Sequence, residues 1–472
     1  MAITDLDSIF RAGEPWPPTS EAARLQAYER YSRLYEGDHD AVFADLNPKE
    51  LARVGMDLNW FRRVCTLFSD LLWGETPRFE ASKGQEALDR ILEANSFNLR
   101  AYDATVDMIK HGTGLFKIRF DKRGIIEVID PRLWFPVCNP DNAAEVTAHI
   151  LAWTVYKPDE NGKDEPYLRL EIHHPGRIEN RLYKLKEGKI EKAVDLATIA
   201  RYRDLPDEIE TGIEDFLIVP IHNLKASNAV AGRSDLADLE DVVHEIEKRA
   251  AQISRVLDQH ADPKLIAPSN LVTIDPTTGQ AFFTASGSRV YIVNEGEKEP
   301  SYLTWNAELE YAFRQVEMMK DHLQAVGEIS PAILGDVKNG LAESGSALKR
   351  LALPTLAKVN RLRQRIDPQL KEVLRICAEL EVASRMSGAT LIENLTIAWR
   401  DGLPADAMEN AQVENLRTVA RLTSRRAALS RLDEGATEKD IDAELEAIEK
   451  ELEADRVQVI DNEPLKLEMG EP

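Results

Sequence analysis

Three carboxylates at the start of a long predicted helix are the residues whose types could bind a divalent metal ion. Asp238, Glu240 and Asp241 lie within four positions, and clustered carboxylates are the ligands that metal-dependent phosphoryl transfer needs. The same helix carries an apolar seam that begins at Leu236, and on a helical projection the carboxylates fall on the solvated side of that seam. We therefore expect a solvated helix face here and not a metal site.

Other motifs that resemble catalytic sites each lack a residue that the chemistry needs. The His-Gly-Thr-Gly at 111–114 lacks the Gly-Lys-Ser/Thr ending of a phosphate loop and reads as a glycine turn entering a strand. The His-Glu at 244–245 has no second histidine four residues on, and the histidines at 173–174 would point to opposite faces of a strand. The Ser-Gly-Ser at 344–346 is a helix N-cap and not a nucleophile elbow. We predict that the protein is not an enzyme and needs no cofactor and no metal.

Composition sets further bounds on the class of protein. The 472 residues include 82 acidic and 59 basic side chains, giving a formal net charge of −23, and 43% are hydrophobic. This length allows about two to four domains. Cys65, Cys138 and Cys377 are too scattered for a disulfide framework or a zinc ribbon. The acidic balance opposes nucleic-acid binding, no apolar run is long enough to span a membrane, and residues 1–18 do not resemble a signal peptide.

Periodicity divides the first half of the chain into helices followed by strands. Apolar residues recur at helical spacing over 21–35, 48–73 and 85–110. After the glycine turn the period changes to two, which predicts strands separated by glycine turns. The predicted strands are 115–120, 125–129, 134–137, 147–157, 167–173 and 177–186. We expect a mixed sheet domain beside a helical layer.

Two long helices flank a small island of strands in the middle of the chain. The first, 234–262, holds a heptad-like spacing that needs a neighbouring helix. Its seam comprises Leu236, Leu239, Val243, Ile246 and Ile253. The island, 263–300, has predicted strands at 265–267, 271–274, 281–284 and 289–292, and the second helix covers 306–326. The two helices should pack antiparallel and carry the island at the end of a stalk.

A glycine-rich loop and a third long helix follow. Glycines at 327, 335, 340 and 345 indicate a flexible loop. In the helix from about 348 to 380, Pro354 and Pro368 each predict a kink or a break. Its basic residues have two open interpretations, a solvated helix face or a stripe that faces phosphates. These basic residues are Lys349, Arg350, Lys358, Arg361, Arg363 and Arg365. A β segment at 389–399 and helices at 406–422, 425–432 and 438–452 complete the chain.

The order of these elements resembles the portal proteins of tailed bacteriophages, in particular the siphophage-type family. The segments that carry the resemblance are Ile129–Val137, Gly232–Leu236, Ser344–Leu348 and Trp399–Pro404, together with the strand island between two long helices. The resemblance covers nearly the whole chain. It implies an α+β fold of portal type, with a mixed α/β wing, a two-helix stem, a small β-rich clip, a long kinked helix and a helical crown.

The resemblance also implies domain boundaries. The wing would be 1–233, the stem helices 234–262 and 305–327, the clip 263–304 and the tunnel loop 328–345. The kinked wing helix and β segment would be 346–403, and the helical crown with its acidic tail 404–472. The last 42 residues, 431–472, hold 15 acidic and 5 basic side chains, so they carry a charge of −10.

The function that the resemblance implies is a ring of twelve copies at one capsid vertex, with a channel for double-stranded DNA during packaging and ejection. Its partners would be further copies of itself, the terminase large subunit, the major capsid and scaffold proteins and a head-completion adaptor, with no membrane. It would be assembled in the host cytoplasm and reside in the virion. From position and charge, Gly335, Lys338, Asn339, Gly340 and Lys349 would line the channel. Pro354 would kink the wing helix, and the seam from Leu236 to Ile253 would pack against neighbouring subunits.

Two alternatives from other classes stay open. One is a metal-dependent nucleic-acid-processing enzyme that uses the acidic helix clusters, which would need carboxylates converging on one site. The other is an acidic helical scaffold or adaptor whose charged tail binds basic partners. The second explains the tail but not the order of helix, strand island, helix, loop and kinked helix.

Overall fold

A computed structural model describes residues 3–39, 59–159, 162–261, 264–266, 272–283, 296, 299, 301–303, 309–336, 349–400, 407–432 and 438–461. The chain divides into two compact units, which are described separately. The larger comprises Met1–Leu334 and Leu353–Gly402, and the smaller Gly335–Ala352 and Leu403–Pro472. The mixed α+β class predicted from the sequence is confirmed.

A layer of helices forms one side of the larger unit. It contains α1 (Ala22–Glu36), α4 (Trp60–Trp73), α5 (Gln85–Ala94) and α6 (Phe97–His111). The apolar face of α4 is fully buried, as its spacing predicts. The predicted helix 85–110 is instead two helices, because Asn95 turns the chain. Its side chain accepts a hydrogen bond from the Ile126 amide at 2.9 Å and donates to the Gly124 carbonyl at 3.2 Å.

A central sheet lies next to this helical layer. Its strand order is β10-β2-β3, all antiparallel, and the strands are β2 (Thr113–Asp121), β3 (Arg123–Ile129) and β10 (Ile218–His222). One face packs on α6 and on α10 (Leu353–Ala383): a Cβ at Gly114 would meet the Ala104 carbonyl of α6, and one at Gly124 would meet Cys377 of α10. The strand β10 was not predicted.

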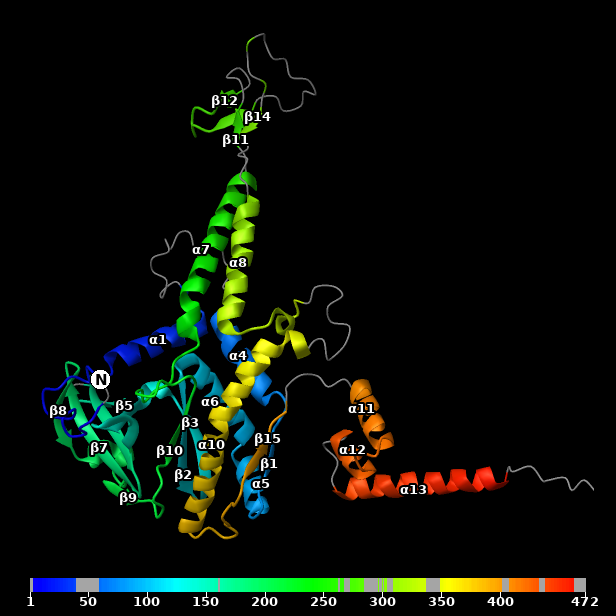
Figure 1. The fold of residues 1–472 in the computed structure, drawn as a ribbon. Coiled ribbons are helices and arrows are strands. Elements are labelled where there is room, and N and C mark those ends of the chain that lie inside the picture. Colours follow the sequence, from blue (N-terminus) through cyan, green and yellow to red (C-terminus); the bar gives the residue numbers. More distant parts are fainter. Residues whose placement is uncertain are drawn as a thin grey trace, which may run out of the picture. The chain divides into compact units, whose positions relative to one another are not determined.

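An outer sheet covers the opposite face of the central sheet. Its order is β4-β5-β6-β7-β8, with β9 also paired to β7. The strands are β4 (Trp134–Asn139), β5 (Asn142–Pro158), β6 (Asp164–His174), β7 (Arg177–Lys186), β8 (Lys189–Val194) and β9 (Glu208–Glu210). Leu115 and Ile218 of the central sheet pack against Trp134 and Leu151 of the outer sheet. The unit therefore has three layers, helices, central sheet and outer sheet (Figure 1).

The remaining face of the outer sheet is covered by the N-terminal segment. Ile3 pairs with Val137 of β4. Phe10 stacks with Trp16 and Tyr183, and the Trp16 ring contacts the Phe135 ring at a tilt. Short 3-10 turns η1 (Pro131–Leu133), η2 (Leu196–Thr198) and η3 (Ala200–Tyr202) connect strands of this region. Residues 3–16 are therefore packed on the outer sheet. They fall within the predicted wing, 1–233, but this packing was not predicted.

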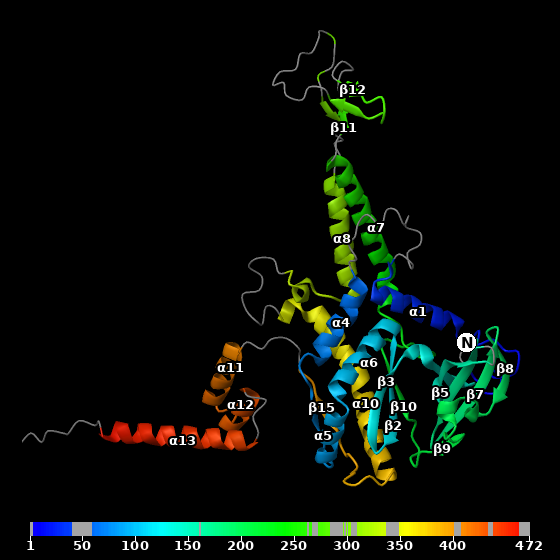
Figure 2. The same cartoon turned by 180° about the vertical axis from the view of Figure 1, so that it is seen from behind.

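The helices α7 (Leu236–Ala261) and α8 (Leu309–Gly327) pack side by side (Figures 1 and 2). The predicted seam lies on α7, where Leu236, Leu239, Val243 and Ile246 are at most 4% exposed and Ile253 is 8% exposed. The first four belong to the main core, which Leu323 of α8 also joins. One chain already covers these side chains, and their contact with neighbouring subunits stays a prediction.

Short strands lie between α7 and α8 in the chain, as predicted. They are β11 (Lys264–Ile266), β12 (Val272–Ile274), β13 (Ala281–Phe283) and β14 (Ser301–Leu303). The pairs are β11 with β14 and β12 with β13, both antiparallel. The predicted strand 289–292 lies outside the described residues, and β14 was not predicted.

The helix α10 lies against the helical layer and the central sheet (Figure 1) and buries one stripe of side chains there. The stripe has the helical spacing expected from the sequence and comprises Val359, Leu362, Ile366, Leu370 and Val373. Pro354 lies in the first turn of α10, where proline costs no intrahelical hydrogen bond, and a turn at Ala352 separates α10 from a helical segment at 349–351. The helix continues through Pro368, so no break occurs there.

Two further parts complete the chain. In the larger unit, β15 (Thr396–Ala398) pairs antiparallel with β1 (Arg78–Glu80), so the segment after α10 returns to the segment between α4 and α5. The smaller unit contains α11 (Ala407–Val419), α12 (Arg425–Leu432) and α13 (Glu438–Asp461). The bounds of α12 are those predicted, and α13 extends beyond its predicted end at 452.

Candidate functional site

The predicted tunnel loop begins where α8 ends, and the structure describes how that end is held. The chain leaves α8 through Glu328, whose φ of 57° is left-handed, and the Ile329 amide donates to the Gln324 carbonyl at 2.8 Å. This geometry ends the helix and satisfies one of its last carbonyls. A short 3-10 turn, η5 (Pro331–Leu334), follows.

The first three turns of α10 bind this helix end. The buried Thr355 hydroxyl accepts a hydrogen bond from the Ser330 amide at 2.7 Å and donates to the Glu328 carbonyl at 3.0 Å. Arg361 binds the Glu328 carboxylate through both terminal nitrogens, and the longer contact measures 3.2 Å. A bidentate guanidinium-carboxylate pair fixes orientation as well as distance. The entry to the loop is therefore bound to the helix that follows it.

Lys358 joins this helix end to the start of α7. Its Nζ lies 2.6 Å from the Asp235 carboxylate, 3.1 Å from the Gly327 carbonyl and 4.0 Å from the centre of the Phe68 ring. The side chain is 4% exposed and that of Asp235 is 11% exposed. A buried charge is tolerated only when it is paired and hydrogen-bonded. Burial also raises the pKa of the nearby Cys65 thiol, which makes it unreactive.

The segment Gly232–Leu236 holds Asp235 in place. The Ser234 hydroxyl accepts from the Leu236 amide at 3.0 Å and donates to the Lys110 carbonyl of α6 at 2.5 Å. Asn223 donates to Asp235 Oδ1 at 2.7 Å. Here two backbones approach so closely that a Cβ at Gly112 would lie 2.3 Å from the Gly232 carbonyl oxygen. The glycines at 112 and 232 therefore allow two segments to pack closely, which agrees with the interpretation of 111–114 as a glycine turn and not a phosphate loop.

This arrangement, which we call the loop base, comprises Glu328, Thr355, Lys358, Arg361 and Asp235. It connects α7, α8 and α10 through groups that are already paired, so it offers a rigid support and no reactive group.

Within the described ranges, no group of three His, Cys, Asp or Glu residues could hold a metal ion. In the acidic cluster of α7, Asp238 binds Arg233 and Glu240 binds Arg30.

The basic residues of α10 have a different role from both interpretations made from the sequence. Lys358 and Arg361 belong to the loop base. Arg363 donates to the Arg400 carbonyl and lies 5.7 Å from the Trp399 ring, and Arg365 donates to the Asn223 carbonyl at 3.1 Å. These four side chains bind other parts of the chain and do not form a phosphate-facing stripe. The sequence position of Lys358 could have indicated that its side chain is buried, since it directly precedes the apolar stripe that starts at Val359.

The residues predicted to line the channel are only partly described. Gly335 follows η5 with a φ of 83°, a conformation that favours glycine. Lys338, Asn339 and Gly340 lie outside the described residues. Lys349 is exposed and precedes α10. Sequence reasoning missed Thr355 and Glu328, because their roles depend on contacts between helices.

Comparison with known families decides the identity. The profile of the family described as "Phage portal protein, SPP1 Gp6-like" matches residues 18–458. The chain belongs to this portal family. Portal proteins of this family are structural and not enzymatic, and the segment Gly232–Leu236, which carries part of the resemblance, is the one that positions Asp235 in the loop base.

Several solved structures align with this portal chain. They include "Neck of native GTA particle computed with C12 symmetry", at 12% identity and TM-score 0.46, covering 90% of this chain and 96% of that chain. "Virion of native gene transfer agent (GTA) particle" aligns at 13% identity and TM-score 0.41, covering 89% and 96%. No curated protein matches the sequence. Among the described helices of the portal chain, none is long and apolar enough to cross a membrane.

Proposed function

We propose that the protein forms a ring of twelve subunits at one capsid vertex, with a channel through which double-stranded DNA passes during packaging and ejection. The ring also docks the terminase motor, the capsid and scaffold proteins and later the head-completion adaptor. The observation that carries the proposal is the portal-family match over residues 18–458. The paired helices α7 and α8, with strands between them in the chain, are consistent with a stem and a clip.

Exposed apolar side chains on the stem helices support self-association. Leu257 of α7 and Tyr311, Phe313 and Met318 of α8 are between 46% and 68% exposed. Large apolar side chains that cluster at a surface mark interaction sites, and a ring closes through heterologous contacts between different faces of the same subunit. We assign the contact between neighbouring stems to these side chains.

The loop base supports the channel assignment. A loop that lines a DNA channel must be anchored at its ends and mobile between them. The predicted tunnel loop follows α8 and precedes α10. The contacts of Thr355, Lys358 and Arg361 hold its first residues against α10. We propose that Lys338 and Lys349 face the DNA and that the sparse basic positions keep the duplex mobile, since each phosphate contact adds affinity.

The assembly state of the purified protein tests the ring. Native mass spectrometry and negative-stain microscopy should give a ring of about twelve times the 53.1 kDa chain mass. The double variant Tyr311→Glu, Phe313→Glu should remain monomeric, because charge is placed in an apolar contact. Tyr156→Glu, at a residue of β5 that is 65% exposed, is the matched control and should still form rings. A wild-type protein that is a stable compact monomer at all concentrations would refute the proposal.

The channel residues need a separate test in assembled particles. Lys338→Gln with Lys349→Gln removes two positive charges per subunit, and we expect a changed rate of DNA packaging with unchanged ring assembly. Lys189→Gln, at the exposed start of β8, is the charge-matched control. Unchanged packaging and ejection in the double variant would contradict the channel assignment while leaving the ring intact.

A further inference from the structure

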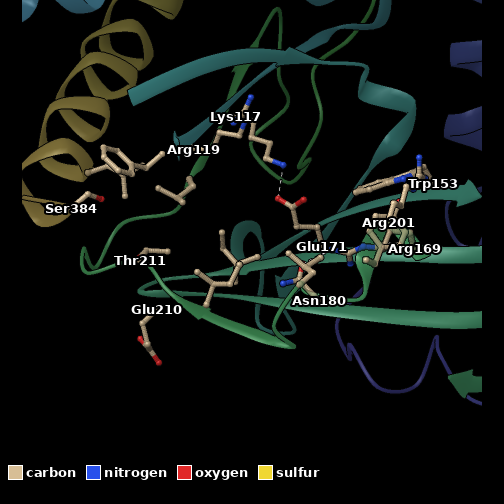
Figure 3. Close-up of a pocket in the computed structure, with 17 residues that line it drawn as sticks. Lys117, Arg119, Trp153, Arg169, Glu171, Asn180, Arg201, Glu210, Thr211 and Ser384 are labelled. Atoms are coloured by element: carbon tan, nitrogen blue, oxygen red, sulfur yellow. Dashed lines mark hydrogen bonds and ion pairs between the residues drawn. The ribbon is translucent and has the colours of Figure 1, made fainter. Parts of the chain in front are cut away.

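A cavity of about 530 Å³ lies between the central and outer sheets, away from the loop base. Figure 3 shows side chains of both sheets entering it, with Lys117 and Arg119 from β2 and Trp153 and Arg169 from β5 and β6. The C-terminal end of α10 closes one end through Leu380 and Ser384. The volume is within the range of roughly 300 to 1,000 Å³ that small-molecule sites occupy. Nothing in the proposed portal function requires such a cavity.

One end of the cavity carries two guanidinium groups on one aromatic ring. Arg169 lies between two rings, 5.6 Å from the centre of Trp153 and 5.2 Å from that of Tyr202. Arg201 lies 4.6 Å from the centre of Tyr202. Figure 3 shows Arg169, Arg201 and Trp153 grouped together at this end.

Neither guanidinium has a carboxylate partner among the residues that the structure describes. Arg169 is 2% exposed, and its hydrogen bonds go to neutral oxygens of Leu170, Asn180 and Arg181. Burial lowers the pKa of Arg169; the nearby Glu171 carboxylate and Tyr202 oppose this effect, and the charge of Arg201 adds to it. Two like charges beside each other in a partly buried site repel, so an anion placed there would be favoured.

Of the other charged groups of the cavity, Lys117, Arg119 and Glu171 are paired, and Glu210 lies apart from Arg169 and Arg201 (Figure 3). Lys117 lies 2.6 Å from Glu171, which His173 also contacts at 2.7 Å, and Arg119 lies 2.9 Å from Glu127. These contacts with Lys117 and His173 hold the pKa of Glu171 at about 2 although burial alone would raise it, so the carboxylate stays ionised. The free positive charge is therefore concentrated at the end with Arg169 and Arg201.

The rest of the cavity is mostly apolar, with Thr211 and Ser384 among its few polar groups. Its walls include Phe120 and Leu217 from the side of the central sheet, Ile178 and Ile209 from the outer sheet, and Leu380 of α10. A ligand that fits both ends must have a charged head and an apolar body. In most small-molecule sites a few polar groups likewise fix the orientation of a ligand held mainly by apolar walls.

We propose that this pocket binds a small amphipathic anion, meaning one carboxylate, sulfonate or phosphate group attached to an apolar body. The anionic group lies beside Arg201, where the fixed charge of Arg169 adds to the attraction. The apolar body extends between the two sheets toward Leu380 and Ser384. An aliphatic acid and an aromatic acid share this chemistry, and the experiment distinguishes them.

The test uses two probes on the full-length protein. Anilinonaphthalene sulfonate, an aromatic sulfonate, is titrated by fluorescence, and decanoate, an aliphatic acid, is titrated by calorimetry and as a competitor. We read only the fluorescence that decanoate displaces, since the dye also binds exposed apolar surface. If decanoate binds but displaces no dye, the pocket takes aliphatic acids. If decanoate does not bind but dye binding changes in the variants, the pocket takes aromatic acids.

Variants locate the site. Arg201→Gln should weaken decanoate binding roughly tenfold or more, because a charge-assisted contact is lost, and should leave binding of neutral decanol unchanged. Ser384→Trp should weaken all probes by filling the apolar end. Arg123→Gln, an exposed arginine at the start of β3, is the control and should bind as wild type. Binding of neither probe, or equal losses of decanoate and decanol in Arg201→Gln, or full binding in Ser384→Trp, would overturn the proposal.

Discussion

Lys358 and Asp235 form a buried ion pair with 2.6 Å between Nζ and the carboxylate, and the pair connects α10 to the start of α7. The same Nζ donates to the Gly327 carbonyl at the end of α8. One side chain thus joins three long helices at the point where the predicted tunnel loop leaves the stem.

Removing the charge of Lys358 should destabilise the larger unit strongly. Lys358→Met leaves the Asp235 carboxylate buried without its partner, and breaking a buried pair in this way costs roughly 3 to 5 kcal/mol. Urea unfolding of the unassembled chain, followed by circular dichroism, measures the loss. The double variant with Asp235→Asn should recover part of it, because no charge is then left buried.

The control for this prediction is Lys371→Met. Lys371 pairs with Asp367 on the same helix at 2.6 Å, but both side chains are more exposed. Such a pair contributes about 0 to 1 kcal/mol. Equal decreases in the free energy of unfolding of the two lysine variants would show that the buried pair stabilises the protein no more than the exposed pair does.

Thr355 should control the local stability of the loop entry. Thr355→Val keeps the shape of the side chain but removes the acceptor for the Ser330 amide and the donor to the Glu328 carbonyl. Leaving such buried groups unpaired costs about 1 to 3 kcal/mol. Hydrogen exchange at the amides of residues 329–334 should accelerate, with little change in the central sheet.

Thr66→Val is the matched control for Thr355. Its hydroxyl donates to the Arg63 carbonyl at 3.2 Å on a partly exposed face of α4. Water can replace this bond, so exchange at 329–334 should stay as in wild type. Unchanged exchange in Thr355→Val would mean that the loop entry does not depend on α10.

Local pattern determined how much of the fold could be predicted. The bounds of β7 follow from period-two alternation between two glycine turns, and those of α12 were predicted at both ends. β10 was missed because its five residues give too short a pattern; its place is set by pairing with β2, where His222 lies opposite Thr113. The helix break at Asn95 was missed because its side chain acts through contacts with β3.

The candidate site was predictable in location but not in composition. The glycines and the order of elements placed a loop after α8. The partners of Lys358 and Thr355 come from segments that are distant in sequence, and a single sequence gives no pairing information for them. The seam of α7 shows the same limit: its spacing required a neighbouring helix but could not tell α8 of the same chain from a helix of another subunit.

Gly112 should be intolerant to substitution because of crowding and not only because of its backbone angle. Its φ is 88°, and a Cβ would lie 2.3 Å from the Gly232 carbonyl oxygen. Gly188 has a comparable φ of 72° with nothing within 4 Å of its Cβ position. Gly188→Ala should cost about 1 to 2 kcal/mol from backbone strain alone.

Gly112→Ala should cost at least about 2 kcal/mol more than Gly188→Ala, since the backbones of two segments must separate. Thermal unfolding of both variants side by side measures the difference. Similar melting temperatures would show that the contact between Gly112 and Gly232 can relax. In that event the tight junction between α6 and the start of α7 would not fix the position of Asp235.

Stability should fall as the pH drops below about 6.5. Burial lowers the pKa of His111, His149 and His222 to about 3, with smaller contributions from neighbouring positive charges such as Lys110 and Lys225. The unfolded chain, where histidine has a pKa near 6.5, therefore binds more protons than the folded chain in this range. Stability is complete above about 6.5 and decreases toward pH 3, by about 1.4 kcal/mol per pH unit for each histidine.

The pH range and a variant isolate this contribution. The Glu171 carboxylate, whose pKa is about 2, would act in the same direction only at lower pH. Burial raises the pKa of Asp103, Asp107 and Glu372, which act in the opposite direction. Urea unfolding of wild type and variant at pH 6.0, 5.5 and 5.0 cancels these shared contributions. His222→Gln should reduce the change in the free energy of unfolding per pH unit by about the contribution of one histidine, because glutamine takes no proton in either state. His322→Gln, on the exposed side of α8, should leave it unchanged. A slope that does not differ between wild type and His222→Gln would mean that His222 is protonated in the folded protein, and that water reaches the space between the central and outer sheets.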